Sequence, residues 1–175
     1  AAAAGAVPSG TAPFVVPRRL RPVPRPVYNR KRTGKGAQRM RVIFLDVDGV
    51  LCTPLSVALS NLLRLPMDRQ LFDPIALFWL RRLVKTTGAA VVLSSSWREE
   101  LYLDEPFCRA VIDNLYRTLA RNHTPITDAT PLLEQGGKGA EIAAWLERHP
   151  CESYAVLDDR DCFASAPTVA GHWVR

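Results

Sequence analysis

The chain has 175 residues, a length that suits one domain with an additional tail. Hydrophobic residues make up 47% of the chain, enough for a core, and no apolar run approaches the length of about 18 residues that a membrane-spanning helix needs. The net charge of +6 is unevenly distributed, because residues 1–41 hold ten Lys or Arg and no acid, whereas residues 42–175 hold thirteen Lys or Arg against seventeen acids.

Residues 1–39 predict an extended tail, because its prolines block both helix and sheet. One interpretation is contact with RNA or a ribonucleoprotein through residues 14–41, since closely spaced cations bind phosphates. The residues expected to bind nucleic acid are Arg18, Arg19, Arg21, Arg25, Arg30, Lys31, Arg32 and Lys35. The other interpretation is a solvated linker or the remnant of a targeting peptide, and the basic, acid-free composition indicates import into the mitochondrial matrix. The cysteines form no CxxC pair, which fits a reducing, intracellular compartment.

A folded domain over residues 40–175 is predicted from strands that alternate with helices. Apolar runs typical of strands covered on both faces occupy residues 41–45, 89–93 and 154–157, and a fourth strand is expected at 172–174. Helices are expected over residues 55–65, 74–87, 104–121 and 138–149, and residues 122–137 are expected to form a loop. The helix at 104–121 is expected to point four side chains inward: Phe107, Val111, Leu115 and Leu119. This order favours a doubly wound α/β domain with a mostly parallel sheet.

A polar residue directly follows each of the three apolar strands, namely Asp46, Ser94 and Asp158. In open α/β sheets, ligands bind beyond the carboxyl ends of the strands, so these three side chains are expected to share one crevice. Asp46 and Asp48 are two residues apart, and crowded carboxylates call for a cation or a shared proton. Oxygen ligands of this kind suit Mg²⁺.

Four sequence motifs resemble those of the haloacid dehalogenase (HAD) superfamily. The run DVDGVL, which begins at Asp46, resembles motif I, and Ser94 at the end of VVL is similar to the Ser or Thr of motif II. Lys138 in GGKGAEIAAWL resembles motif III, and Asp158 with Asp159 in YAVLDD resembles motif IV. The runs VVLSSSWRE and KGAEIAAWLERHP are most similar to the small capless HAD group found in RNA-repair-like multidomain proteins.

The resemblance implies a role for each matched residue. Asp46 would be the nucleophile that forms an aspartyl-phosphate, and Asp48 the general acid and base. Ser94 and Lys138 would bind phosphate oxygens. The ligands of Mg²⁺ would be Asp46, the backbone carbonyl of Val47 and Asp158, and Asp159 would support these ligands or bind the ion through water.

Three assignments next to motif II stay open in the sequence. Ser95 is the phosphate ligand if the strand ends one residue later than expected. Arg98 is expected either to contact substrate or to pair with one of the acids Glu99, Glu100 and Asp161. Trp97 is interpreted as a packing residue rather than a platform for stacking bases.

Two functional hypotheses follow. The first is a Mg²⁺-dependent phosphomonoesterase with an aspartate nucleophile, acting on a nucleic-acid end or another macromolecular phosphate. The second is a non-enzymatic HAD-like subunit or assembly factor of a ribonucleoprotein, for example a mitochondrial ribosome, anchored to RNA by its basic tail.

Overall fold

The computed structural model describes residues 40–101, 105–161 and 166–175. The tail predicted for residues 1–39, with all the basic residues expected to bind nucleic acid, lies outside this range, as does Asp104. No helix in the described part of the chain is both long and apolar enough to cross a bilayer.

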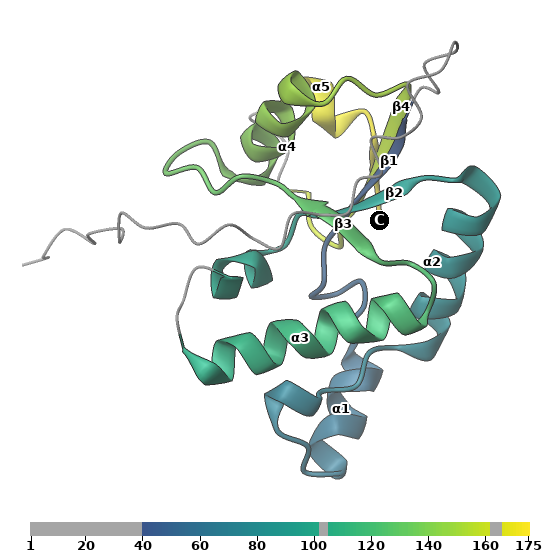
Figure 1. Cartoon of the computed structure of the whole chain (residues 1–175), viewed down its shortest axis with the longest axis vertical. Helices are drawn as coiled ribbons and strands as arrows, with labels where there is room; N and C mark the ends of the chain where they lie inside the picture. The colour runs from purple at the N-terminus through teal and green to yellow at the C-terminus, as the bar shows by residue number, and fades with distance from the viewer. Residues whose placement is uncertain (1–39, 102–104, 162–165) are drawn as a thin grey trace, which may run out of the picture.

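Five parallel strands form one sheet in the order β3-β2-β1-β4-β5, which confirms the predicted α/β class (Figure 1). The central strand is β1, and the strand order reverses between β1 and β4, where open sheets of this kind bind their ligands. The bounds are β1 Arg41–Leu45, β2 Ala90–Leu93, β3 Ile126–Ala129, β4 Ser153–Leu157 and β5 Trp173–Val174.

Helices cover both faces of the sheet (Figure 1). The bounds are α1 Pro54–Leu62, α2 Pro74–Thr87, α3 Pro106–Arg121, α4 Gly137–Arg148 and α5 Pro167–Ala170, with 3₁₀ turns at η1 Met67–Arg69 and η2 Ser96–Leu101. Alternate β1 side chains enter the two cores: Leu45 packs with residues of α2 and α3, while Phe44 packs with Ile142 and Trp145 of α4. The apolar run of β1 is therefore continuous because both faces of this strand are buried.

Local signals account for the ends of α2. The Asp73 carboxylate caps the helix by accepting hydrogen bonds from the amides of Ile75 at 2.8 Å and Ala76 at 3.3 Å. Asp73 also accepts a hydrogen bond of 2.6 Å from the Thr53 hydroxyl, the largest of the effects that lower the pKa of this carboxyl. Gly88 ends the helix in the left-handed region at φ +67°. Asp73 and Gly88 therefore set the two ends of this helix, which has the bounds predicted from the sequence.

The structure corrects two of the expected elements. Residues 126–129, predicted as loop, form the edge strand β3, which bonds to β2 despite its half-buried, partly polar sequence ITDA. Phe107, predicted to point inward from α3, is 54% exposed, because it lies in the first turn, before the helix reaches the core at Val111. The other three inward positions, Val111, Leu115 and Leu119, are buried as predicted.

Helix α1 was expected over residues 55–65 and ends earlier, at Leu62. It buries its serines and exposes its leucines. Ser56 and Ser60 are 2% and 4% exposed, and the Ser60 hydroxyl donates to the Ser56 carbonyl and accepts from the Leu71 amide. Leu62 is 77% exposed. Hydrogen bonding to the following loop, rather than burial of leucine, therefore orients this helix.

Candidate active site

The side chains that follow β1, β2 and β4 meet at one edge of the sheet. Leu45 is level with Leu93 on one side and Leu157 on the other, so the next residue of each strand lies at the same height. The sheet hydrogen bonds continue one residue further, from the Asp46 amide to the Leu157 carbonyl at 2.9 Å and from the Ser94 amide to the Leu45 carbonyl at 2.8 Å. The backbone therefore fixes the positions of Asp46, Ser94 and Asp158 beside the point where the strand order reverses.

Three carboxylates cluster at this edge. Asp46, Asp158 and Asp159 each offer an oxygen, and the three oxygens lie within 4.8 Å of one another. Asp46 is 6% exposed and Asp158 1%, so this negative charge is withdrawn from water. Burial of like charges is unfavourable unless cations compensate it. The cluster therefore has the charge, the oxygen atoms and the burial that a hard divalent cation requires.

Lys138 contributes the cation of this cluster. Its ammonium nitrogen Nζ lies 2.5 Å from Asp158 Oδ2 and 3.1 Å from Asp46 Oδ2. Burial opposes the charged form, but the hydrogen bond to Asp158 and the charges of both carboxylates outweigh it, and the pKa of Lys138 is raised above its ordinary value. The side chain thus stays an ammonium at neutral pH. The four side chains comprise three carboxylates and one ammonium, so a divalent cation would balance the remaining negative charge.

A tight turn follows Asp46. The Val47 carbonyl accepts hydrogen bonds from the amides of Val50 at 3.3 Å, Leu51 at 2.8 Å and Cys52 at 2.8 Å. Three donors commit this oxygen to the turn, so the expected role of Val47 as a metal ligand does not fit the structure. Burial, and then the charges of Asp48 and Asp46, raise the pKa of the Cys52 thiol to about 12, so it is no nucleophile at neutral pH.

Gly49 allows the same turn to approach the carboxylate cluster. Its φ of +77° lies in the left-handed region, which side chains other than glycine rarely adopt. A Cβ atom at this position would overlap the carboxylate of Asp159. The turn therefore requires glycine both for its backbone and for the space that Asp159 occupies.

The two serines that follow β2 differ in their bonding. The Ser94 hydroxyl is buried and makes no hydrogen bond with the residues that the structure describes. The Ser95 hydroxyl accepts from the Trp97 amide at 3.4 Å, within its own turn. Because buried hydroxyls are normally bonded, Ser94 is the serine available to a ligand.

The comparisons with known proteins agree with this arrangement. A family profile described as "HAD domain in Swiss Army Knife RNA repair proteins" matches residues 42–175. The chain belongs to this HAD family. Neither the curated proteins nor the solved structures gave a match. The family is one of phosphoryl-transfer hydrolases that generally use Mg²⁺, and the resemblance predicted from the sequence motifs is confirmed.

Arg98 of this HAD domain makes a buried ion pair that sequence analysis did not anticipate. Its guanidinium binds Glu141, three residues after Lys138 on α4, rather than Glu99 or Asp161, and NH1 also donates to the Ser95 carbonyl at 2.7 Å. Glu141 in turn accepts from the Leu133 amide at 3.2 Å. Arg98 and Glu141 are 3% and 6% exposed. Substrate contact by Arg98 stays a prediction, while its described bonds join the motif II turn to α4.

Trp97 packs in the core, as interpreted from the sequence, and also reaches motif I. Its indole nitrogen Nε1 donates to Asp48 Oδ2 at 3.0 Å, while its ring lies 6.0 Å from that of Phe72. Asp48 itself is exposed. The sequence contains no local signal for this pair, because 49 positions separate its members.

The structure therefore brings together most of the predicted site. Asp46, Lys138, Asp158 and Asp159 share one cluster. Ser94 lies level with Asp46, Ser95 follows it in the turn, and Asp48 lies on the turn that follows Asp46. Arg98 is paired with Glu141, and the Val47 carbonyl accepts hydrogen bonds within its own turn.

Proposed function

We propose that this HAD domain is a Mg²⁺-dependent phosphomonoesterase in which Asp46 is the nucleophile. The observation that carries the proposal is the Lys138 ammonium between Asp46 and Asp158, at 3.1 and 2.5 Å. A carboxylate needs no such neighbours for folding at a strand end. Beside a cation, and next to a free buried hydroxyl, it is set to attack an anionic phosphoryl group.

The residues present fit Mg²⁺. The cluster offers only oxygen ligands, from Asp46, Asp158 and Asp159, and Lys138 balances only part of their charge. When bound, Mg²⁺ would neutralise charge on the phosphoryl oxygens. Val47 is not among the proposed ligands, because its carbonyl accepts three hydrogen bonds within its own turn.

Two displacements at phosphorus make up the proposed reaction. In the first, an Asp46 oxygen forms a bond to phosphorus, the bond from phosphorus to the ester oxygen breaks, and Asp48 gives its proton to that leaving oxygen. In the second, Asp48 takes a proton from water, the water oxygen bonds to phosphorus, and the bond to Asp46 breaks. The products are an alcohol and inorganic phosphate, and Asp48 has regained its proton.

Groups from two segments would hold the phosphoryl oxygens. The Ser94 hydroxyl is buried and available, and the Lys138 ammonium is kept charged by its carboxylate partners. Lys138 lies in the first turn of α4, and the N-cap residue Gly136 supplies no side-chain cap. The amides at the start of such a helix favour anions. Phosphate binding gives this lysine a reason to lie where the helix dipole disfavours a cation.

An open site suits a phosphate on a large substrate, such as a nucleic-acid end. Asp48 is exposed, and the described segment between motifs I and II contains only the short helices α1 and η1 before α2 begins. The ten Lys or Arg of residues 1–41 provide the charge for holding a polyanion. We propose a macromolecular phosphomonoester on these grounds.

The test is hydrolysis of p-nitrophenyl phosphate with Mg²⁺ by the full chain and by Asp46→Asn. We expect the variant to lose at least about a thousand-fold in kcat, since removing a nucleophile has effects of that size. Asp128→Asn is the matched control, because Asp128 is a carboxylate on β3 that bonds to Trp145 outside the cluster. Activity that survives in Asp46→Asn would contradict the proposal.

The alternative function is a non-enzymatic subunit or assembly factor of a ribonucleoprotein, located in mitochondria. The acid-free charge of residues 1–41 favours it. Deleting residues 1–39 and measuring co-sedimentation with large particles at several salt concentrations tests it. Association that does not change on deletion counts against RNA anchoring by the tail.

A further inference from the structure

The acid–base residue of the proposed site is exposed, and the donor that holds it is buried. Asp48 lies on the turn after Asp46, whereas Trp97 is 8% exposed in the core cluster under α3. The two meet through one hydrogen bond of 3.0 Å, from Trp97 Nε1 to Asp48 Oδ2. An exposed carboxylate normally moves among several rotamers, so this bond selects one of them.

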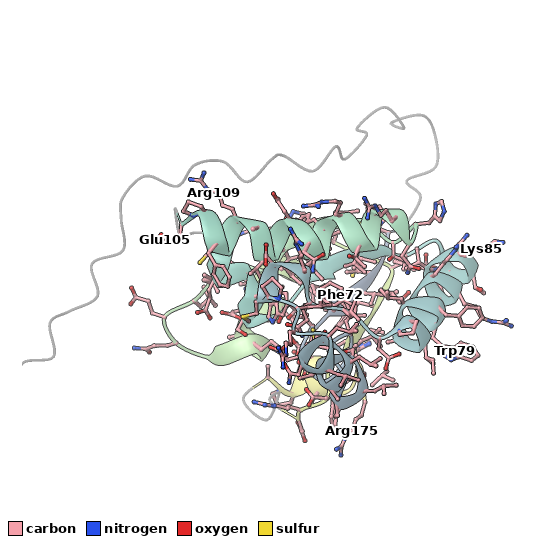
Figure 2. The ribbon with its side chains drawn as sticks, turned by 90° about the horizontal axis from the view of Figure 1, so that it is seen from below. Phe72, Trp79, Lys85, Glu105, Arg109 and Arg175 are labelled. Carbon is pink, nitrogen blue, oxygen red and sulfur yellow. The ribbon has the colours of Figure 1, made fainter. Side chains whose placement is uncertain are left out.

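The donor is rigid because three interactions fix Trp97. Its ring packs against Phe72 at a centroid distance of 6.0 Å, and Phe72 lies inside the fold (Figure 2). Its amide donates to the Ser95 hydroxyl, and residues of η2 pack against α3. The indole nitrogen therefore occupies a fixed point next to motif I.

The indole N–H also distinguishes the two oxygens of Asp48. Indole is only a donor, so the Asp48 oxygen that it contacts, Oδ2, is the acceptor in this bond. Oδ1 makes no hydrogen bond with any residue in the described ranges, and it is the oxygen left for exchanging a proton with substrate or water.

We infer that Trp97 is a positioning residue for proton transfer, which holds Asp48 so that Oδ1 faces the leaving oxygen. The inference rests on the proposed function. Packing alone requires a large aromatic ring at position 97 but no nitrogen at that edge. A variant that lacks the nitrogen but keeps an aromatic ring therefore tests the positioning role separately from packing.

The experiment compares two esters, because only one of them needs an acid. Phenolate is a poor leaving group and requires a proton, whereas p-nitrophenolate leaves readily without one. Trp97→Phe keeps an aromatic ring beside Phe72 and removes the N–H. We expect kcat/KM for phenyl phosphate to fall about ten- to a hundred-fold, below the full effect of general acid catalysis, and that for p-nitrophenyl phosphate to fall less than about three-fold.

Three further variants sharpen the result. Asp48→Asn is expected to show the same dependence on leaving group with a larger loss, and adding Trp97→Phe to it is expected to cause no further loss, since both changes remove one function. Trp145→Phe is the matched control: Trp145 is also buried and donates from Nε1 to a carboxylate, Asp128, at 2.8 Å. We expect Trp145→Phe to leave kcat/KM unchanged for both esters.

Equal losses for both esters in Trp97→Phe, or additive losses in the double variant, would overturn the positioning role while leaving the phosphatase proposal intact. A wild-type chain that hydrolyses neither ester in Mg²⁺ overturns both. If Trp97→Phe does not fold, as judged by circular dichroism, replacing the indole at position 97 by benzothiophene keeps its shape without a donor. The same dependence on leaving group is then expected.

Discussion

Helix α4 contributes one residue to each of two sets of charged side chains, and the two sets differ in charge balance. Arg98 and Glu141 are one cation and one anion, each makes one further hydrogen bond to the backbone, at Ser95 and Leu133, and Arg98 Nε has no partner among the described residues. The carboxylate cluster has Lys138 against three carboxylates, with Asp46 and Asp158 buried. A balanced pair holds segments together, whereas an unbalanced cluster can accept a ligand. Charge balance therefore distinguishes the structural pair Arg98–Glu141 from the candidate binding site at Lys138, three residues earlier on α4.

Breaking the balanced pair is expected to have the largest effect. Arg98→Met leaves the Glu141 carboxylate buried without its cation, which costs about 3–5 kcal/mol in free energy of unfolding. Urea denaturation measures this loss. Arg98→Met combined with Glu141→Met is expected to recover most of it, because the double variant leaves no buried charge. Arg82→Met, at an exposed position over the Trp79 ring, is the control and is expected to change stability by less than about 0.5 kcal/mol.

Removing the cation of the unbalanced cluster is expected to affect activity first. Lys138→Met takes away a donor to the phosphoryl oxygens, so kcat/KM for p-nitrophenyl phosphate should fall about 10²–10³-fold. Lys85→Met is a matched control, because Lys85 points out from α2 into solvent (Figure 2). If Lys138→Met keeps full activity, the lysine serves only to balance Asp46 and Asp158.

Magnesium should stabilise the unbalanced cluster and not the balanced pair. At a Mg²⁺ concentration of about a hundred times Kd, the free energy of unfolding should rise by about 2.7 kcal/mol. Asp158→Asn should reduce this gain, whereas Asp128→Asn should retain it, since Asp128 lies outside the cluster. Thermal unfolding with and without Mg²⁺ checks the prediction. An equal gain in all three proteins would place the bound ion elsewhere.

The smallest effect concerns the spacing of the cluster. Gly88→Ala places a side chain at positive φ and should cost about 1–2 kcal/mol of stability, and Gly49→Ala should cost at least as much. Only at Gly49 does the new Cβ meet Asp159, since nothing lies within 4 Å of the position at Gly88. Gly49→Ala alone should therefore also weaken the stabilisation by Mg²⁺. The same Mg²⁺ response in both variants would show that Asp159 does not hold the ion.

Sequence signals were sufficient where the physics is local. The ends of β1, β2 and β4 could be recognised because an apolar run stops at a polar residue, and α2 could be delimited by Asp73 and Gly88. The two contacts that organise the site were not predictable in this way. Arg98 and Glu141 are 43 positions apart, and Trp97 and Asp48 are 49 apart. Such pairs depend on the packing of η2, α4 and the motif I turn.

Two elements show how tertiary context overrides local pattern. β3 has the sequence ITDA, with no apolar run, and it forms because β2 offers an open edge. In α1, Ser56 and Ser60 face inward because their hydroxyls bond to backbone carbonyls and to the following loop. Hydrogen bonding at these positions outweighs the usual preference of leucine for the interior.

Helix α4 carries Lys138 in one set and Glu141 in the other, within a single turn of helix. A shift of this helix relative to the sheet changes both sets together, because their side chains leave the same rigid backbone. The geometry of the carboxylate cluster and the stability of the fold therefore depend on the same helix. For protein engineering, this means that Lys138 cannot be relocated by moving α4 without also replacing the Arg98–Glu141 pair.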